Sequence, residues 1–113
     1  MRSLRLENML CSAIKKHRVI QLRYKNELFD RTFEPYVIYF SPTDKNFVLL
    51  GGTQTKDDSK PLQLPEPHKF EVELLSHIVV TDDTFDYDPR FDPTRPEYRN
   101  GVICVIKRTQ VGE

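Results

Sequence analysis

The first part of the chain changes its hydrophobic period once, and this change predicts a helix followed by a strand. After Ser3, which can cap a helix, apolar side chains recur every three or four positions as far as Ile14. Cationic residues follow at the carboxyl end, where they complement the helix dipole. We therefore predict an amphipathic helix over residues 4–16. Apolar residues then alternate along residues 18–24, which is typical of a half-buried strand.

The remainder consists of short extended segments separated by polar turns and loops. After a turn at residues 25–27, a long extended run covers 28–40, and Pro35 within it marks an edge, a bulge or a bend. Further strands are predicted at 47–50, where Gly51-Gly52 ends the strand, and at 70–74, 78–80 and 102–106. A long connection is expected at 53–69 and an irregular, proline-rich arm at 88–100. A helix followed by five or six short strands, with little room for a crossover helix, predicts a small, strongly bent antiparallel sheet that closes into a barrel.

Composition limits the class of protein. The 113 residues suit one domain, and 17 basic and 17 acidic side chains cancel, which excludes a strongly basic nucleic-acid binder. A mean hydropathy of −0.55, no membrane-spanning apolar run and no secretion signal at the N-terminus predict a soluble, cytoplasmic protein. Its two cysteines, Cys11 and Cys104, are expected to be reduced, small buried hydrophobes, with a disulfide between them as the alternative.

The charges are segregated along the chain. Residues 1–31 hold eight basic and three acidic side chains, a net charge of +5, so the remainder carries −5. The densest acidic stretch runs from Asp82 to Glu97 and holds six acids and two arginines. This distribution predicts a dipolar or self-complementary molecule, with ordinary surface charge as the simpler interpretation.

The motifs of most enzyme and metal sites are absent from the sequence. It contains no phosphate-binding glycine loop and no nucleophile elbow, and His17, His68 and His77 lack metal-ligand spacing. The acidic stretch lacks the glycine and the terminal glutamate of a calcium loop, so its carboxylates are expected to be solvated. We therefore predict no catalytic residue, metal or cofactor. An enzyme that uses His68 or His77 with a nearby carboxylate is the weakest alternative.

One predicted hairpin places cations beside aromatic rings. Arg23, Lys25 and Arg31 are interleaved with Tyr24 and Phe29, an arrangement that suits phosphate contacts and base stacking. Arg31, Arg23, Tyr24 and Lys25 are therefore the predicted ligand-binding residues. In the alternative interpretation the arginines form cross-strand ion pairs with Glu34, Glu71 or Glu73.

Five short features follow one another between Leu10 and Phe85. They are Ala13-Ile14, Val19-Ile20-Gln21-Leu22-Arg23-Tyr24, Arg31-Thr32-Phe33-Glu34-Pro35, Phe47-Val48-Leu49 and Thr81-Asp82-Asp83-Thr84-Phe85. Their order and spacing resemble the WYL domain, a small Sm-like barrel found mostly as the ligand-sensing part of bacterial transcription regulators and also in stand-alone form. The segment Arg95-Pro96-Glu97-Tyr98 resembles an arm of the short stand-alone versions. The resemblance covers about two-thirds of the chain, and the order of the features carries it rather than any single motif.

The sequence departs from the family at the motif that gives the family its name. Phe47-Val48 replaces Trp-Tyr, and His68 and Leu74 stand where the family has two arginines associated with anionic ligands. The resemblance therefore implies only Arg31 as an anion anchor. No helix-turn-helix precedes the barrel in this sequence, so we do not expect a complete DNA-binding regulator of that type.

These observations together predict one WYL-like domain over residues 1–113, mainly β with an N-terminal helix. Residues 1–17 are assigned to the helix, 18–85 to a small Sm-like or SH3-like antiparallel β-barrel, and 86–113 to an irregular proline-rich arm and final strand. The first functional hypothesis is a non-enzymatic ligand-binding or regulatory module that recognises a nucleic acid or a nucleotide-like anion. The alternative is a protein-interaction subunit, or a homo-oligomer that associates through the acidic arm.

Overall fold

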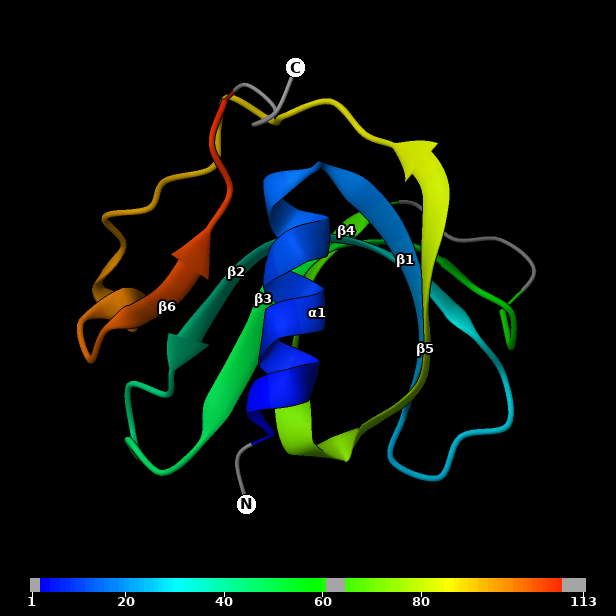
Figure 1. The fold of residues 1–113 in the computed structure, drawn as a ribbon, viewed down its shortest axis with the longest axis horizontal. Helices are drawn as coiled ribbons and strands as arrows, with labels where there is room; N and C mark the ends of the chain where they lie inside the picture. The colour runs from blue at the N-terminus through cyan, green and yellow to red at the C-terminus, as the bar shows by residue number, and fades with distance from the viewer. Residues whose placement is uncertain (1–2, 61–64, 109–113) are drawn as a thin grey trace.

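A computed structural model describes residues 3–60 and 65–108 and shows one helix packed on a curved antiparallel sheet (Figure 1). Two short 3-10 turns, η1 and η2, complete the secondary structure. In chain order the elements are α1 (Leu4–Lys15), β1 (Arg18–Tyr24), β2 (Arg31–Phe40), β3 (Val48–Asp57), β4 (Glu66–Glu71), η1 (Val72–Leu74), β5 (Leu75–Thr84), η2 (Pro96–Tyr98) and β6 (Val102–Val105). None of the described helices is long and apolar enough to cross a membrane.

The N-terminal helix forms as the sequence predicts. The Ser3 hydroxyl accepts a hydrogen bond from the Leu6 amide at 3.2 Å and so caps the first turn. Leu10 and Ile14 are buried against the sheet. The chain leaves the helix through His17, whose φ of 55° reverses its direction.

The sheet has the order β4-β3-β2-β1-β5, and every pairing is antiparallel. Strand β2 is its hub, because β3 pairs along one edge while β1 and β6 share the other. The prediction of a mainly β chain with one N-terminal helix is confirmed. Closure into a barrel is not observed, because no pairing joins β4 to β5 within the described segments.

Pro35 marks a bulge, one of the three possibilities that the sequence left open. The register between β2 and β3 shifts between Pro35 and Val37, so that Tyr36 is the additional residue. The predicted extended run begins too early, however. Residues 28–30 belong to the β1–β2 loop, and Phe29 is 54% exposed.

Two predicted boundaries near the middle of the chain are wrong. Gly51-Gly52 does not end a strand, because β3 continues through both glycines to Asp57 and pairs with β2 along its whole length. The predicted connection over 53–69 is largely strand, although its residues 61–64 lie outside the described segments. Pro67 fits within β4 because β4 is an edge strand that, among the described residues, pairs with β3 alone.

The segment after β4 is also divided differently from the prediction. The predicted strand over 70–74 ends at Glu71, and residues 72–74 form the 3-10 turn η1. The predicted strand at 78–80 is the middle of the longer β5, which also takes in the start of the acidic stretch. His77 has a φ of 52° at an irregularity in the β1–β5 pairing. The last predicted strand, in contrast, is confirmed as β6.

The expectation of reduced cysteines is wrong, because Cys11 and Cys104 form a disulfide with a Cα–Cα distance of 5.9 Å. β6 pairs with the second half of β2, and this places Cys104 beneath the middle of α1. Both residues are only half-buried. Reduced thiols therefore no longer support the predicted cytoplasmic location.

Candidate functional site

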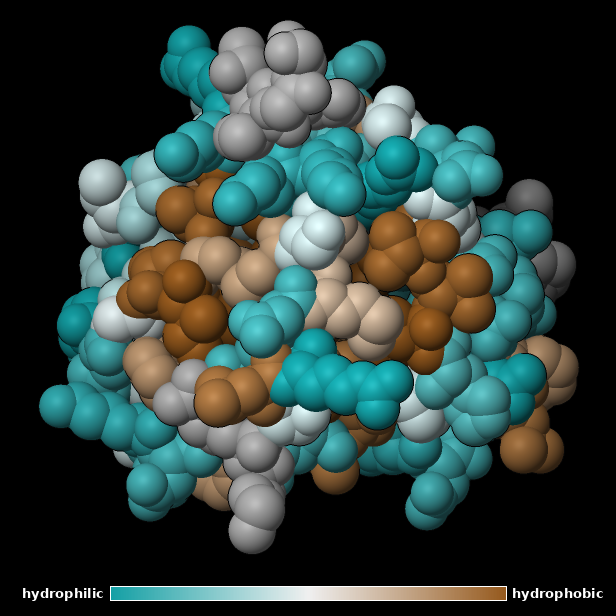
Figure 2. Space-filling model, viewed as in Figure 1, coloured by the Kyte–Doolittle hydropathy of each residue, from teal (hydrophilic) through white to brown (hydrophobic). Residues whose placement is uncertain are grey.

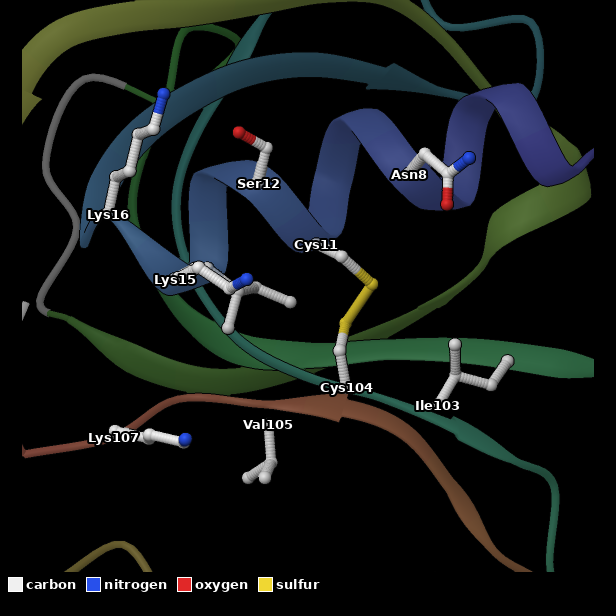
Figure 3. Close-up of a pocket in the computed structure, with 10 residues that line it drawn as sticks. Asn8, Cys11, Ser12, Lys15, Lys16, Ile103, Cys104, Val105 and Lys107 are labelled. Carbon is white, nitrogen blue, oxygen red and sulfur yellow. A yellow bond between two sulfur atoms is a disulfide. The ribbon is translucent and has the colours of Figure 1, made fainter. Parts of the chain in front are cut away.

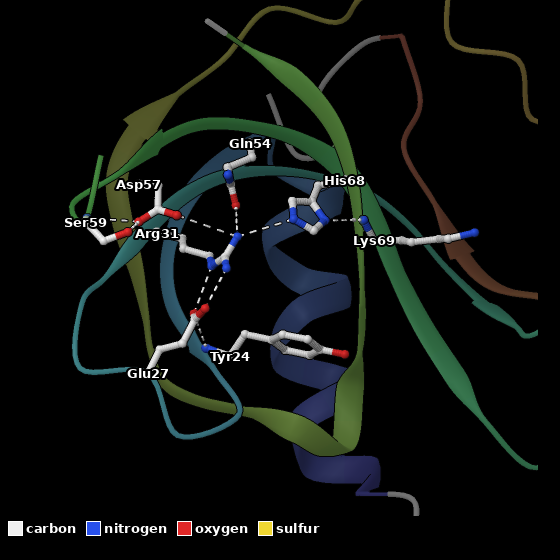
Figure 4. Close-up of polar contacts among 8 residues, drawn as sticks. All are labelled: Tyr24, Glu27, Arg31, Gln54, Asp57, Ser59, His68 and Lys69. Atoms are coloured by element: carbon white, nitrogen blue, oxygen red, sulfur yellow. Dashed lines mark hydrogen bonds and ion pairs between the residues drawn. The ribbon is translucent and has the colours of Figure 1, made fainter. Parts of the chain in front are cut away.

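The guanidinium group of Arg31 lies in the middle of a polar cluster at the start of β2 (Figure 4). Glu27, in the β1–β2 loop, accepts two parallel hydrogen bonds, from Nε to Oε1 at 2.9 Å and from Nη2 to Oε2 at 2.6 Å. Arg31 Nη1 donates to Gln54 Oε1 at 2.7 Å and lies 3.8 Å from Asp57 Oδ2. Both of these β3 side chains are buried. Arg31 therefore supplies the positive charge and the hydrogen-bond donor that these buried polar groups need.

The pKa shifts in this cluster follow from the same contacts. The hydrogen bonds to Glu27 raise the pKa of Arg31, and those from Arg31 lower the pKa of Glu27. Burial acts to raise the pKa of Asp57, but hydrogen bonds from Ser59 and the charge of Arg31 outweigh it and lower that pKa. The carboxylates therefore stay ionised around a fixed cation.

The other predicted ligand-binding residues divide into two groups. The Tyr24 ring packs on Phe70 at 4.9 Å, and the Arg31 guanidinium lies over the same ring at 5.6 Å, so Tyr24 and Arg31 are brought together. Lys25 Nζ lies 5.6 Å from the Tyr24 ring centre. Arg23 is engaged separately, because its Nε donates to Asp30 Oδ1 at 2.9 Å.

The two predicted arginines therefore carry acidic partners within the chain, as the alternative interpretation expected. The partners are nevertheless Glu27, Asp57 and Asp30 rather than Glu34, Glu71 or Glu73. The difference arises because Glu27 and Asp30 lie in the β1–β2 loop, which folds back over the start of β2, and Asp57 lies beside Arg31 at the end of β3. No periodicity in the sequence reports that loop geometry.

Arg31→Ala is expected to lower the free energy of unfolding by about 2–3 kcal/mol, because it leaves Asp57 and Gln54 buried without their cationic partner. Arg23→Ala, which removes a half-exposed pair, is the matched control and should cost less than about 1 kcal/mol. Urea unfolding followed by circular dichroism measures both values. Equal losses for the two variants would contradict the central role of Arg31.

A second feature, which sequence reasoning missed, is a groove between β3, β4 and the C-terminal arm. Two adjoining cavities of about 450 Å³ each form it, and we call it the arm groove. They share Gly52, Pro67, Arg95 and Tyr98. The other lining residues are Tyr36, Tyr39, Gly51, Thr53, Pro65, His68, Lys69, Asp88, Arg90, Phe91 and Glu97.

Aromatic contacts hold the arm in position and build the wall of this groove. Phe91 packs on Tyr36 at 5.1 Å between ring centres, and Tyr98 packs edge-on against Tyr39 at 4.7 Å. The Asp88 amide donates to the Tyr36 hydroxyl at 3.0 Å. Burial raises the pKa of Tyr39, and it raises the pKa of Tyr98 to about 12. Both phenols therefore stay protonated at neutral pH and can donate hydrogen bonds.

The charged side chains of the arm groove are three cations, Lys69, Arg90 and Arg95, and two carboxylates, Asp88 and Glu97. Arg90 binds Asp88 through two hydrogen bonds at 3.0 and 3.2 Å, and Arg95 lies 3.5 Å from Glu97. Both arginines are more than half exposed, so these local pairs hold them only weakly against a competing anion.

His68 connects the arm groove to the Arg31 cluster. Its ring stacks on Phe70 at 4.5 Å, and its Nε2 lies 3.3 Å from Arg31 Nη1. Arg95-Pro96-Glu97-Tyr98 and Gly51-Gly52 each stand out in the sequence. No local pattern, however, indicates that segments more than forty positions apart face each other.

The carboxyl of Glu34 adjoins the acidic side of the arm. Burial raises its pKa, and the charges of Asp86 and Asp88 raise it further. Because the pKa is higher in the folded state than in the unfolded state, folding is favoured by protonation, and stability is lost as pH rises through the folded pKa.

Glu34→Gln is therefore expected to stabilise the protein at pH 7, by up to about 1 kcal/mol, and to have little effect at pH 3. Thermal unfolding at both pH values measures the difference. Glu71→Gln, a similarly half-buried change on β4, is the control. A Glu34→Gln variant less stable than the parent at pH 7 would contradict the sign.

The other two histidines, His17 and His77, contact neighbouring groups of the protein. His17 is 3% exposed, its Nε2 lies 2.7 Å from the Lys107 carbonyl oxygen, and its ring stacks on Phe85. His77 is exposed and contacts the neighbouring Ser76 hydroxyl. Among the residues that the structure describes, no three His, Cys, Asp or Glu side chains are grouped to hold a metal ion.

Comparison with known proteins gave no match to any family model, curated protein or solved structure.

Proposed function

We propose that this protein is a non-enzymatic binding module and that its arm groove holds a nucleotide-like anion. The observation that supports this most is the combination of exposed arginines with aromatic side chains along a glycine floor. Stacking on Tyr98 or Phe91 would suit a base, and Arg90 or Arg95 would suit a phosphate. Gly51 and Gly52 line the groove, so the β3 backbone forms part of its floor.

Of the ligand-binding residues predicted from the sequence, Arg31 contributes to this proposal through its contact with His68. Arg31 and its partners fix the His68 ring on Phe70, so Arg31 acts as a positioning residue rather than a direct contact. Arg23, Tyr24 and Lys25 do not line either cavity of the arm groove. Their part in the proposal is limited to supporting the Arg31 cluster.

Calorimetric titration at low salt tests the proposal, with adenosine monophosphate and a short single-stranded oligonucleotide as probes. Arg95→Ala should weaken binding about tenfold or more, because it removes a charge-assisted contact. Arg5→Ala, which removes the same charge from an exposed position on α1, should leave binding unchanged apart from a small salt-dependent effect. The proposal fails if neither probe binds, or if both variants weaken binding equally.

The finer fold assignment also belongs to the proposal. The order β4-β3-β2-β1-β5 behind an N-terminal helix supports an open form of the Sm-like barrel that the WYL resemblance implies. Hydrogen exchange tests closure, because slow exchange of outward-facing β5 amides would indicate pairing with β4. Fast exchange along that edge would favour the open sheet. The cytoplasmic location stays a prediction.

A further inference from the structure

A second groove, which shares no lining residue with the arm groove, lies between α1 and β6. Its volume is about 560 Å³, and the Cys11–Cys104 disulfide crosses it and joins its two walls (Figure 3). Ile14 from α1 and Ile103 and Val105 from β6 give it an apolar lining. Figure 2 shows apolar side chains reaching the surface on both flanks of α1.

The charged side chains that line this groove are all lysines. Lys15 and Lys16 come from the end of α1, and Lys107 follows β6. None of the three forms an ion pair within residues 3–60 and 65–108, and no carboxylate from these segments lines the groove. The arm groove, in contrast, contains Asp88 and Glu97 beside its arginines.

The cations and the apolar surface are separated along the groove. Figure 3 shows Lys15 and Lys107 near the carboxyl end of α1, while the disulfide and Ile103 lie further along towards Asn8. The hydrogen-bond contact between His17 Nε2 and the Lys107 carbonyl oxygen, at 2.7 Å, holds the cationic end together. Asn8 to Lys16 spans about 12 Å of helix, which sets the length of a molecule that could lie along it.

We propose that the α1–β6 groove binds a linear amphipathic anion, an alkyl chain with a carboxylate head. The head would lie between Lys15 and Lys107, and the chain would cover the disulfide, Ile103 and Val105. The three lysines favour a negatively charged head group, and the apolar floor favours an alkyl chain. This site is separate from the arm groove, so it does not depend on the function proposed above.

The acidic arm of a second copy fits this groove less well. Aromatic residues of the acidic stretch (residues 82–97) are engaged within their own chain. Phe85 contacts His17 and Tyr36, and Phe91 contacts Tyr36. A second copy would therefore bring exposed carboxylates to the lysines but no apolar group to the floor. An alkyl carboxylate supplies both.

The test is a titration of the full oxidised chain with hexanoate, octanoate and decanoate below their micellar concentrations. Affinity should rise about two- to fourfold for each methylene buried. Lys15→Ala/Lys107→Ala should weaken decanoate binding about tenfold or more. Arg5→Ala/Lys45→Ala, an equal change of charge at exposed positions outside the groove, should have little effect.

Decyltrimethylammonium, which has the same chain and the opposite charge, should not bind. Equal binding of the cation, no binding of decanoate, or equal effects of the two double variants would overturn the proposal. Sedimentation completes the test. A concentration-dependent dimer that Lys15→Ala/Lys107→Ala abolishes would show that a second copy occupies the groove, and would also overturn it.

Discussion

Cys11→Ala/Cys104→Ala is expected to unfold with a free energy about 4 kcal/mol lower than that of the oxidised parent. The crosslinked residues are 93 positions apart, so the disulfide constrains nearly the whole unfolded chain. The native state also loses the covalent link between α1 and β6, a four-residue strand that within the described residues pairs with β2 alone. Urea unfolding monitored by circular dichroism measures the difference.

The parent protein provides the control for this prediction. Reductant should lower the stability of the parent towards that of the double variant and should leave the variant itself unchanged. Cys104→Ala alone should match the double variant, because either change removes the crosslink. A loss below about 1 kcal/mol would contradict the prediction, and it would mean that the denatured chain keeps its ends close together even without the crosslink.

The elements predicted correctly are those that local periodicity specifies. The helix pattern that ends at Ile14 and the alternation in residues 18–24 are properties of one segment, and both elements form where they are expected. The ring of Pro35 fixes φ and removes the backbone N–H, so the sequence alone could place a bulge among the predicted outcomes. The errors arise where the partner strand decides the structure. Gly51-Gly52 resembles a strand end in sequence, but pairing with β2 keeps both residues in β3.

The candidate sites show the same division between local and long-range information. The sequence predicts Arg31 as a ligand-binding residue, since arginine beside aromatic residues is a local pattern, and the structure places it in a polar cluster. Its carboxylate partners were not identified, because Glu27 lies in a loop that returns over β2 and Asp57 lies at the end of β3. The disulfide and the α1–β6 groove join segments from opposite ends of the chain, and the arm groove joins β3 and β4 to the C-terminal arm. Only the pairing of β6 with β2 and the packing of the arm bring those segments together.

Gly52→Ala is expected to destabilise the protein by about 3 kcal/mol, because the bulge in β2 brings another backbone against this glycine. A Cβ atom at position 52 would lie 2.1 Å from the Glu34 carbonyl oxygen and 2.9 Å from the Phe33 ring. Phe33 is fully buried, and the carbonyl belongs to the sheet, so neither group can move without disturbing the β2–β3 pairing. Urea unfolding gives the change in free energy.

Gly51→Ala is the matched control, since it adds the same methyl group one residue earlier in the same strand. Its Cβ would meet Val37 Cγ1 at 3.2 Å and the Tyr39 ring at 3.4 Å, contacts that small side-chain shifts can relieve. The reduced freedom of the unfolded chain offsets that cost, so the net change should stay within about 1 kcal/mol. If Gly52→Ala were as mild as Gly51→Ala, the close approach of Glu34 at the bulge would be wrong, and with it the shape of the arm-groove floor.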